Sequence, residues 1–325
     1  MNMIRWFYAF RALIQLAIGF VEAGWQLRNG FNELKPGRNG IFSSTEFRRF
    51  RHYVFGVSYL NHIFEALLSR KRTQHEILAG MYLAALASFF DDLLEIHRGR
   101  LLQMDQLPDN PDSFGNSMDR GQVAQIILQK VYQFLPETNK ALFDEYLQQL
   151  YKVELQVYTS ANEEDLQAIS TITAQKGSAA VLLFRSILIP EPEHAELKFL
   201  EAFGFLIQLS DDIFDVWFDH HSGTETLATS YLKNHQLSIL TTLFSKQVQA
   251  VDGALIRCKY SKHTNNLVKE YVNLLASVTR VCLHRYKQIE TSSGEFPMAD
   301  RSTMVVDMGL IRNQLLAFRY LLFKH

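Results

Sequence analysis

Apolar residues recur along this chain mainly at helical spacing. They fall at positions i, i+3, i+4 and i+7 over long segments, and alternating apolar and polar runs of the kind that form strands are almost absent. The spacing predicts helices over residues 2–28, 44–70, 73–98, 120–134, 138–160, 163–188, 193–219, 228–250, 262–290 and 302–323. The sequence therefore predicts an all-α protein of about ten helices.

The segments between the predicted helices are rich in turn-forming residues. Gly, Pro, Asn and Asp gather in NGFNELKPGRNG (29–40) and LPDNPDSFGNS (107–117), and shorter breaks occur at IPEPEH (189–194) and SSGEFPMADRS (292–302). No internal repeat is visible and no linker divides the chain. We therefore expect residues 1–325 to form a single all-α domain.

The first 25 residues are apolar, although charged side chains interrupt them. Their longest uncharged stretch, residues 12–21, is about half of the ~20 residues that span a bilayer. No small-residue cleavage site follows. We interpret the segment as an amphipathic or buried helix. The alternative is peripheral membrane contact by a helix lying on the surface, because its first aromatic residues suit an interface: Trp6, Phe7, Tyr8 and Phe10.

Composition narrows the class of protein. With 47 % hydrophobic residues among 325, the chain can bury a sizeable core. The net charge is −1 and no basic block occurs, so we expect no nucleic-acid partner. Cys258 and Cys282 are too few for a disulfide framework, which predicts a reducing, cytoplasmic location.

Two short acidic motifs share one spacing, in which two adjacent carboxylates are followed by a third one turn later. They are DDLLE, with Asp91, Asp92 and Glu95, and DDIFD, with Asp211, Asp212 and Asp215. Residues three and four apart share a helix face, so each motif gathers its carboxylates on one side. Each motif follows a nearly uncharged apolar run that is typical of a buried helix. We expect both motifs to end core helices and to face a common interior.

Carboxylates at close range are costly unless cations neutralise them. Magnesium is held by one or two carboxylates and completes its shell with water and phosphate oxygens. The motifs therefore predict a Mg²⁺ site for a polyphosphate, and the apolar surroundings indicate a hydrocarbon attached to it. The cavity wall is expected to include aromatic residues near the motifs, whose faces can stabilise a carbocation: Phe89, Phe90, Phe203, Phe205, Phe214 and Trp217. The alternative is that each motif is a solvated helix face.

With these motifs the chain resembles the class I isoprenoid synthase superfamily, which comprises trans-prenyltransferases, squalene and phytoene synthases and class I terpene synthases. Its plan is most similar to that of the bacterial large-terpene synthases, whose first motif is DDxxE. The resemblance implies an all-α fold around a central cavity, three Mg²⁺ ions, an isoprenyl diphosphate substrate and a homodimer. It also implies catalytic roles for Asp91, Asp92 and Asp211, and a place for Gln208 in the cavity beside the second motif.

Basic residues are needed to bind the departing diphosphate. In the family that it resembles, a lysine lies about a helix upstream of the second motif, and Lys176 in QKGSAAVLLFR has that place. The adjacent Gly177 would allow a close helix approach. Arg285 in HRYKQ resembles the Arg-Tyr diphosphate sensor of some terpene synthases, with Arg319 in AFRYL as the alternative. Arg185 is expected at a solvent or rim position.

Four functions remain open at this stage: the three described next, and a hydratase or phosphatase in which the acids act as general bases. The favoured one is a Mg²⁺-dependent class I terpene synthase that ionises an allylic diphosphate, releases pyrophosphate and cyclises or deprotonates the carbocation. The second is a prenyltransferase that uses two isoprenyl diphosphates, although its usual motifs are incomplete in HRGR (97–100) and LKPGR (34–38). The third is a catalytically silent helical partner subunit, against which the intact acids of both motifs argue.

Overall fold

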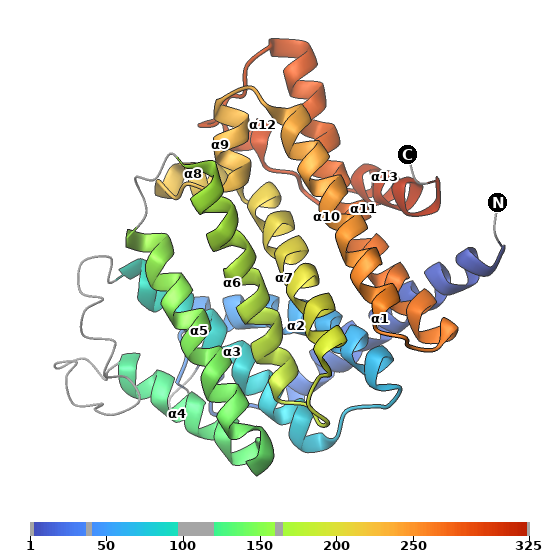
Figure 1. Cartoon of the computed structure of the whole chain (residues 1–325). Helices are drawn as coiled ribbons and strands as arrows, with labels where there is room; N and C mark the ends of the chain where they lie inside the picture. Colours follow the sequence, from blue (N-terminus) through green and yellow to red (C-terminus); the bar gives the residue numbers. More distant parts are fainter. Residues whose placement is uncertain (1–2, 37–40, 97–119, 160–164, 324–325) are drawn as a thin grey trace. The chain divides into compact units, whose positions relative to one another are not determined.

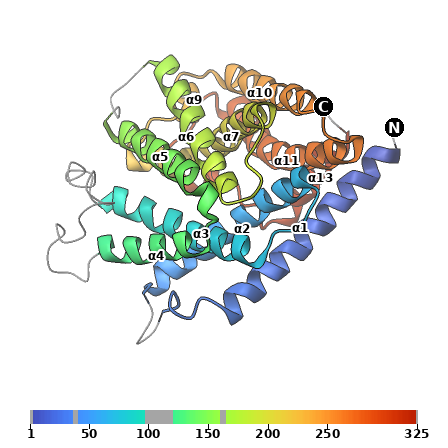
Figure 2. The ribbon, with the colours of Figure 1, turned by 60° about the horizontal axis from the view of Figure 1, so that its bottom comes forward.

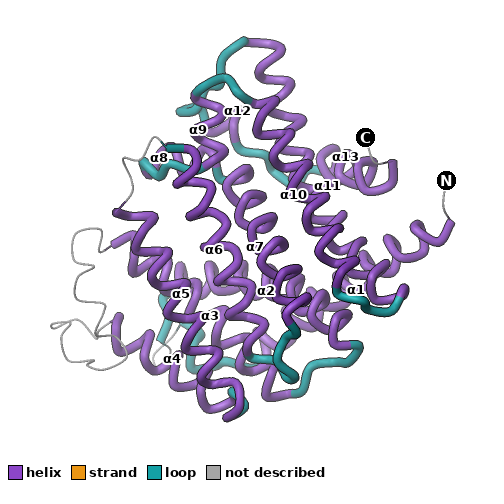
Figure 3. The backbone as a smooth tube through the Cα atoms, viewed as in Figure 1, coloured by secondary structure: helices purple, strands orange, loops and turns teal. Residues whose placement is uncertain are grey.

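The computed structural model describes residues 3–36, 41–96, 120–159 and 165–323, without the side chains of residues 3–4, 90–96, 120 and 158–159. Within these ranges all regular structure is helical, which confirms the predicted all-α class (Figures 1 and 3). The helices are α1 (Met3–Asn29), α2 (Ser44–Leu68), α3 (Gln74–Ile96), α4 (Arg120–Phe134), α5 (Lys140–Thr159), α6 (Leu166–Ser186), α7 (His194–Phe214), α8 (Val216–Ser222), α9 (Leu227–Lys233), α10 (Leu237–Arg257), α11 (Lys262–Ser293), α12 (Arg301–Met304) and α13 (Ile311–Phe323).

Helices α1 to α6 and α11 match single predicted segments to within a few residues at each end. Three other segments are each divided, so their prediction as one helix was wrong. The segment 193–219 is interrupted at Asp215, 228–250 at His235, whose φ is 55°, and 302–323 beyond Met304. At the last break Asp307 accepts a hydrogen bond from the Gly309 amide at 2.7 Å, which forms a turn.

The contacts between residues divide the chain into two compact units. Unit 1 comprises residues 1–12, 145–183 and 192–325, and unit 2 comprises residues 13–144 and 184–191. Since α1, α5 and α6 each continue from one unit into the other, the expected single domain stays a prediction.

In unit 1, α7 contacts α9, α10 and α11, and α11 also contacts α13. The buried face of α7 carries Phe199 and Phe203, whose rings stack at 5.8 Å and are fully enclosed. Leu206, Leu209 and Ile213 continue this face toward the end of the helix. The apolar side of α7 is therefore fixed in the core, which leaves its other side for the acidic residues.

In unit 2, α3 contacts both α2 and α4. The core between these helices is rich in aromatic rings. Phe42 stacks on Phe89 at 6.0 Å, and Tyr82 stacks on Phe134 at 5.9 Å. The predicted wall residue Phe89 is therefore part of an aromatic core, where it is 2 % exposed.

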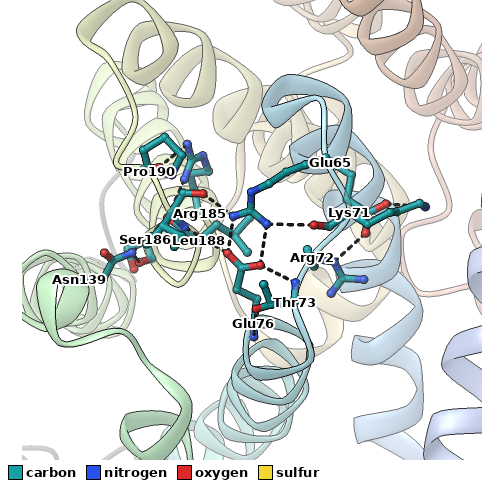
Figure 4. Close-up of polar contacts among 12 residues, drawn as sticks. Glu65, Lys71, Arg72, Thr73, Glu76, Asn139, Arg185, Ser186, Leu188 and Pro190 are labelled. Carbon is teal, nitrogen blue, oxygen red and sulfur yellow. Dashed lines mark hydrogen bonds and ion pairs between the residues drawn. The ribbon is translucent and has the colours of Figure 1, made fainter.

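The connection between α6 and α7 is held by buried polar side chains (Figure 4). Arg185 donates hydrogen bonds to the carbonyl oxygens of Leu188 and Pro190, both at 3.0 Å. Asn139 donates to the Leu188 carbonyl and to that of Ser186. Because Arg185 is 1 % exposed, its expected solvent or rim position was wrong. It supplies donors for backbone carbonyl oxygens beyond the end of α6, which have no hydrogen-bond partner within a helix.

Candidate functional site

The second acidic motif lies where one helix ends and the next begins. Asp211 and Asp212 are in the last turn of α7, Asp215 joins α7 to α8, and Asp219 is on α8. The Asp215 amide donates to the Asp211 carbonyl at 2.9 Å, and the Asp219 amide donates to the Asp215 carbonyl at 2.8 Å. The carboxylates therefore keep an approximately helical spacing across the break.

A buried tyrosine fixes this break. The Tyr286 hydroxyl on α11 donates to the Ile213 carbonyl at 2.8 Å, and the tyrosine is fully buried. In a continuous α-helix this carbonyl would accept from the amide of Trp217, four residues on. The hydroxyl supplies a donor to that carbonyl where the helix is interrupted. Tyr286, the neighbour of the predicted diphosphate ligand Arg285, thus supports the acidic motif from its buried side.

Helix α6 approaches α7 closely enough to exclude side chains from the crossing. A Cβ atom on Gly177 would lie 2.1 Å from the Gly204 carbonyl oxygen, and one on Gly204 would lie 2.3 Å from the Gly177 carbonyl oxygen. The Ser178 hydroxyl donates to the Glu201 carbonyl at 3.0 Å across the same crossing. The predicted close approach at Gly177 is confirmed, and it places Lys176 beside the acidic end of α7.

A cavity of about 110 Å³ lies in unit 1 at this crossing. Four predicted site residues line it: Lys176, Gln208, Asp211 and Asp212. Asp219 lines it as well, together with residues of α5 and α6 and the segment just before α9: Val157, Ile169, Ile172, Thr173, Thr224, Glu225 and Thr226. The volume is below the ~300–1,000 Å³ of pockets that bury drug-sized ligands. The cavity has room for a compact polar group rather than for a long hydrocarbon.

The acids in the cavity have polar partners from both helices. Gln208 donates its amide to Asp212 Oδ1 at 2.9 Å and to Asp211 Oδ2 at 3.3 Å. The Thr173 hydroxyl donates to Asp212 Oδ2 at 3.4 Å. Asp212 is 4 % exposed, whereas Asp211 is exposed at the mouth. Gln208 therefore orients both adjacent carboxylates, which gives the glutamine a defined positioning role.

Among the described lining residues of this cavity, Lys176 carries the positive charge, and its ammonium group already has a carboxylate partner. Its Nζ lies 3.1 Å from Glu154 Oε1 on α5. The charge of Lys176 also lowers the pKa of the Asp212 carboxyl, although this effect is smaller than the opposing effect of burial. Among the described lining residues, the carboxylates thus exceed the positive charge.

The pKa values of the acids are raised. Loss of solvent is the main cause for Asp212, where the hydrogen bond from Gln208 opposes it and the charge of Asp211 adds to it, and the resulting pKa is about 7. Burial and then the charge of Asp211 raise the pKa of Asp215 to about 7. Burial and the neighbouring aspartates raise the pKa of Asp219 to about 8. The cluster would be stabilised by additional positive charge.

The donor set of the cavity suits magnesium. Its available ligands are carboxylate oxygens at the end of α7, on α8 and just before α9, with no cysteine or histidine in the described lining. Among the described side chains, no three His, Cys, Asp or Glu residues converge in a way that could hold a metal ion. This arrangement is compatible with magnesium only where water and phosphate oxygens complete the shell, as is usual for that ion.

Several predicted site residues are not placed in this cavity. The side chains of Phe90, Asp91, Asp92 and Glu95 lie outside the described part of the chain, so their roles stay predictions. Arg285 lines a different cavity, of about 360 Å³, beside Arg312 and Asp307.

The predicted aromatic wall is absent from the described lining of the acidic cavity. Phe203 is in the core, and the Trp217 ring stacks on His221 while its Nε1 donates to the Ala299 carbonyl. Phe214 and Asp215 are likewise not among the lining residues.

Sequence reasoning missed Thr173 and Glu154 of this cavity. Thr173 lies three residues before Lys176 and thus on the same face of α6, a spacing that could have revealed it. Glu154 comes from a distant segment without a recognisable motif. Comparison of the chain with protein-family models, curated proteins and solved structures gave no match.

Proposed function

We propose that this protein is a Mg²⁺-dependent class I terpene synthase that ionises an allylic isoprenyl diphosphate and releases pyrophosphate. The observation that carries the proposal is the excess of carboxylates over positive charge in a cavity that also holds Lys176. A group of neighbouring acids with raised pKa values is costly in the folded protein unless cations join it. The cavity therefore needs a cation, and it has room for a compact polar group. Both features favour a diphosphate that is bound through a metal ion.

Each described residue has a definite part in this mechanism. Asp211 and Asp212 would hold Mg²⁺, which supplies charge neutralisation to the departing diphosphate. Gln208 keeps the two carboxylates oriented through its amide. The Lys176 ammonium lies beside the acids and would bind a diphosphate oxygen, while Glu154 positions it from the far side. The aliphatic residues of α5 and α6 exclude water from one wall.

The first motif completes the proposal. Asp91, Asp92 and Glu95 would provide the remaining metal ligands, with Asp215 in a supporting place. The small volume of the described cavity supports a role for it at the diphosphate end of the substrate. The hydrocarbon tail, the fold around a central cavity and the homodimer belong to the same proposal, and they rest on the resemblance alone.

The test is turnover of geranyl, farnesyl, geranylgeranyl and geranylfarnesyl diphosphate with Mg²⁺, each with and without isopentenyl diphosphate. We expect release of pyrophosphate and a hydrocarbon or alcohol from the allylic substrate alone, detected by gas chromatography–mass spectrometry. Asp211→Asn should lower this activity by roughly 10²-fold or more, because it removes charge that is needed in the transition state. Asp91→Asn should do the same.

Glu201→Gln is the matched control. Glu201 is on the same helix as Asp211, pairs with Lys198 at the surface at 2.7 Å and is outside the cavity, so its activity should equal that of the wild type. A longer diphosphate formed only with isopentenyl diphosphate would replace the proposal by a prenyltransferase. No Mg²⁺-dependent turnover of any substrate would favour the silent partner subunit.

A further inference from the structure

Helix α1 has an unusual distribution of large and small residues. Its buried face consists largely of small ones, with Ala9, Ala12 and Ala23 between 0 % and 6 % exposed. Its large apolar residues are outside instead: Phe7 is 60 % exposed, Phe10 46 %, Ile14 58 %, Ile18 51 %, Val21 74 % and Trp25 65 %. Packing in the protein thus leaves the most hydrophobic side of the helix in water.

Four of these residues lie in unit 2 and form a continuous line, called the α1 stripe from here on: Ile14, Ile18, Val21 and Trp25. They follow one another at steps of three and four, which keeps them on one face of the helix. At about 1.5 Å per residue the line is on the order of 17 Å long. Single exposed apolar side chains are ordinary, whereas a continuous patch indicates contact with another apolar body.

Cationic side chains border the stripe in unit 2. Arg28 is exposed and lies one turn beyond Trp25 on α1. Helix α2 lies beside α1, where the rings of Phe20 and Phe55 are 5.4 Å apart (Figure 2). Arg51 is one turn before Phe55 on that side of α2 and is exposed.

Arg48 is one further turn before Arg51 and is also exposed. Among the described residues beside the stripe, the exposed acid is Glu22, so arginine exceeds acid along this border. Apolar and aromatic side chains bordered by arginine are the chemistry of a helix that lies on an anionic lipid surface.

A second copy of the chain fits the stripe less well. A strip about 17 Å long and about 10 Å wide covers on the order of 170 Å², against the ~800 Å² per partner of a standard stable interface. A membrane-spanning role also fits poorly. Among the described helices, α1 is long and apolar enough to cross a membrane over Arg5–Asn29 by length and composition alone. However, Arg5 is paired with Glu270 at 3.5 Å, and Ala12 is fully buried in the protein.

We propose that the α1 stripe is a lipid-binding surface by which α1 lies flat on an anionic bilayer. The stripe residues enter the boundary between headgroups and acyl chains, and Arg28, Arg48 and Arg51 contact lipid phosphates. The proposal does not rest on the proposed enzymatic activity, since it uses no residue of the acidic cavity.

Flotation with lipid vesicles tests this surface. The vesicles contain phosphatidylcholine with about one-third phosphatidylglycerol. The double variant Ile18→Gln/Val21→Gln should bind them at least about tenfold more weakly, because it removes apolar side chains from the middle of the stripe. Ile256→Gln is the matched control: Ile256 is 69 % exposed but lies on α10, and its substitution should leave binding unchanged.

A second pair of substitutions tests the cationic border. Arg28→Gln/Arg51→Gln should weaken binding to the anionic vesicles by roughly fivefold for each arginine. It should leave binding to pure phosphatidylcholine vesicles unchanged, and added salt should weaken the wild-type protein more than this variant.

Two results would overturn the proposal. One is wild-type protein that does not float with anionic vesicles. The other is a stripe variant that binds them as the wild type does. A dimer seen by light scattering that the stripe variant loses, together with no vesicle binding, would assign the stripe to a second copy of the chain. Melting curves of every variant show whether it is folded.

Discussion

At the scale of single residues, the acidic motif depends on a tyrosine that no motif singles out. The Tyr286 hydroxyl donates to the carbonyl of Ile213, which lies between Asp212 and Asp215. The neighbouring Arg285 had been predicted to bind diphosphate, yet the structure places it in another cavity. Adjacent helical residues point about 100° apart. One of the pair is therefore buried under the site, while the other faces away from that core.

Tyr286→Phe removes one hydroxyl from the buried side of the motif. The Ile213 carbonyl then loses its donor without access to water, so the free energy of unfolding should fall by about 1–3 kcal/mol. The proposed activity should also fall, because the motif is no longer fixed at Ile213. Urea unfolding and pyrophosphate release measure the two effects. Tyr320→Phe is the control: its ring contacts His284 on the half-exposed side of α13, and the change should be below about 0.5 kcal/mol.

At the scale of elements, the crossing of α6 and α7 brings Lys176 to the acids. At the two glycines the backbone of α6 is in direct contact with the backbone of α7. A change of side-chain rotamer therefore cannot relieve a clash there. This geometry also brings Thr173 within reach of Asp212. The position of the cavity therefore depends on two residues that carry no functional group of their own.

Gly204→Ala should force the two helices apart. Its Cβ would lie 2.3 Å from the Gly177 carbonyl oxygen, so we expect a loss of about 1–3 kcal/mol in the free energy of unfolding. The Thr173–Asp212 contact should weaken as well, which lowers the proposed activity. Denaturant unfolding and pyrophosphate release measure these changes.

Gly253→Ala in α10 is the control for this substitution. The nearest atom to its Cβ, on Arg257, would be 3.7 Å away, which is an ordinary contact. The substitution should raise stability by about 0.5–1 kcal/mol, since alanine favours a helix interior over glycine. If Gly204→Ala and Gly253→Ala changed the free energy of unfolding equally, this result would contradict the role assigned to the crossing of α6 and α7.

At the scale of the whole molecule, the acidic cluster connects stability to pH. The pKa is about 7 for Asp212, about 7 for Asp215 and about 8 for Asp219, against an ordinary value of 3.8. Between about pH 4 and about pH 8 the folded protein therefore holds more protons at these groups than the unfolded protein does. By linkage, their contribution to the free energy of unfolding falls as the pH rises over this range.

We accordingly expect this contribution to make the protein less stable at about pH 8 than at about pH 5. Asp219→Asn should reduce this slope, because it removes the group with the highest of the three pKa values. Mg²⁺ with pyrophosphate should raise stability mainly at the higher pH, where a cation favours the ionised carboxylates. Urea unfolding at several pH values measures the slope. An unchanged slope in Asp219→Asn would show that the acids are not coupled to folding.

The sequence by itself determined most helices of this protein and four residues of the acidic cavity. Apolar periodicity and turn residues are local signals, so they located α1 to α6 and α11. The spacing of the acidic residues marked Asp211 and Asp212, and the family resemblance pointed to Gln208 and Lys176. Only the tertiary structure decided where helices are interrupted. It also brought Thr173 and Glu154 to the acids, buried Arg185 and separated Arg285 from Lys176. These outcomes depend on contacts between distant segments, such as the Tyr286 hydroxyl at the Ile213 carbonyl, which no local pattern encodes.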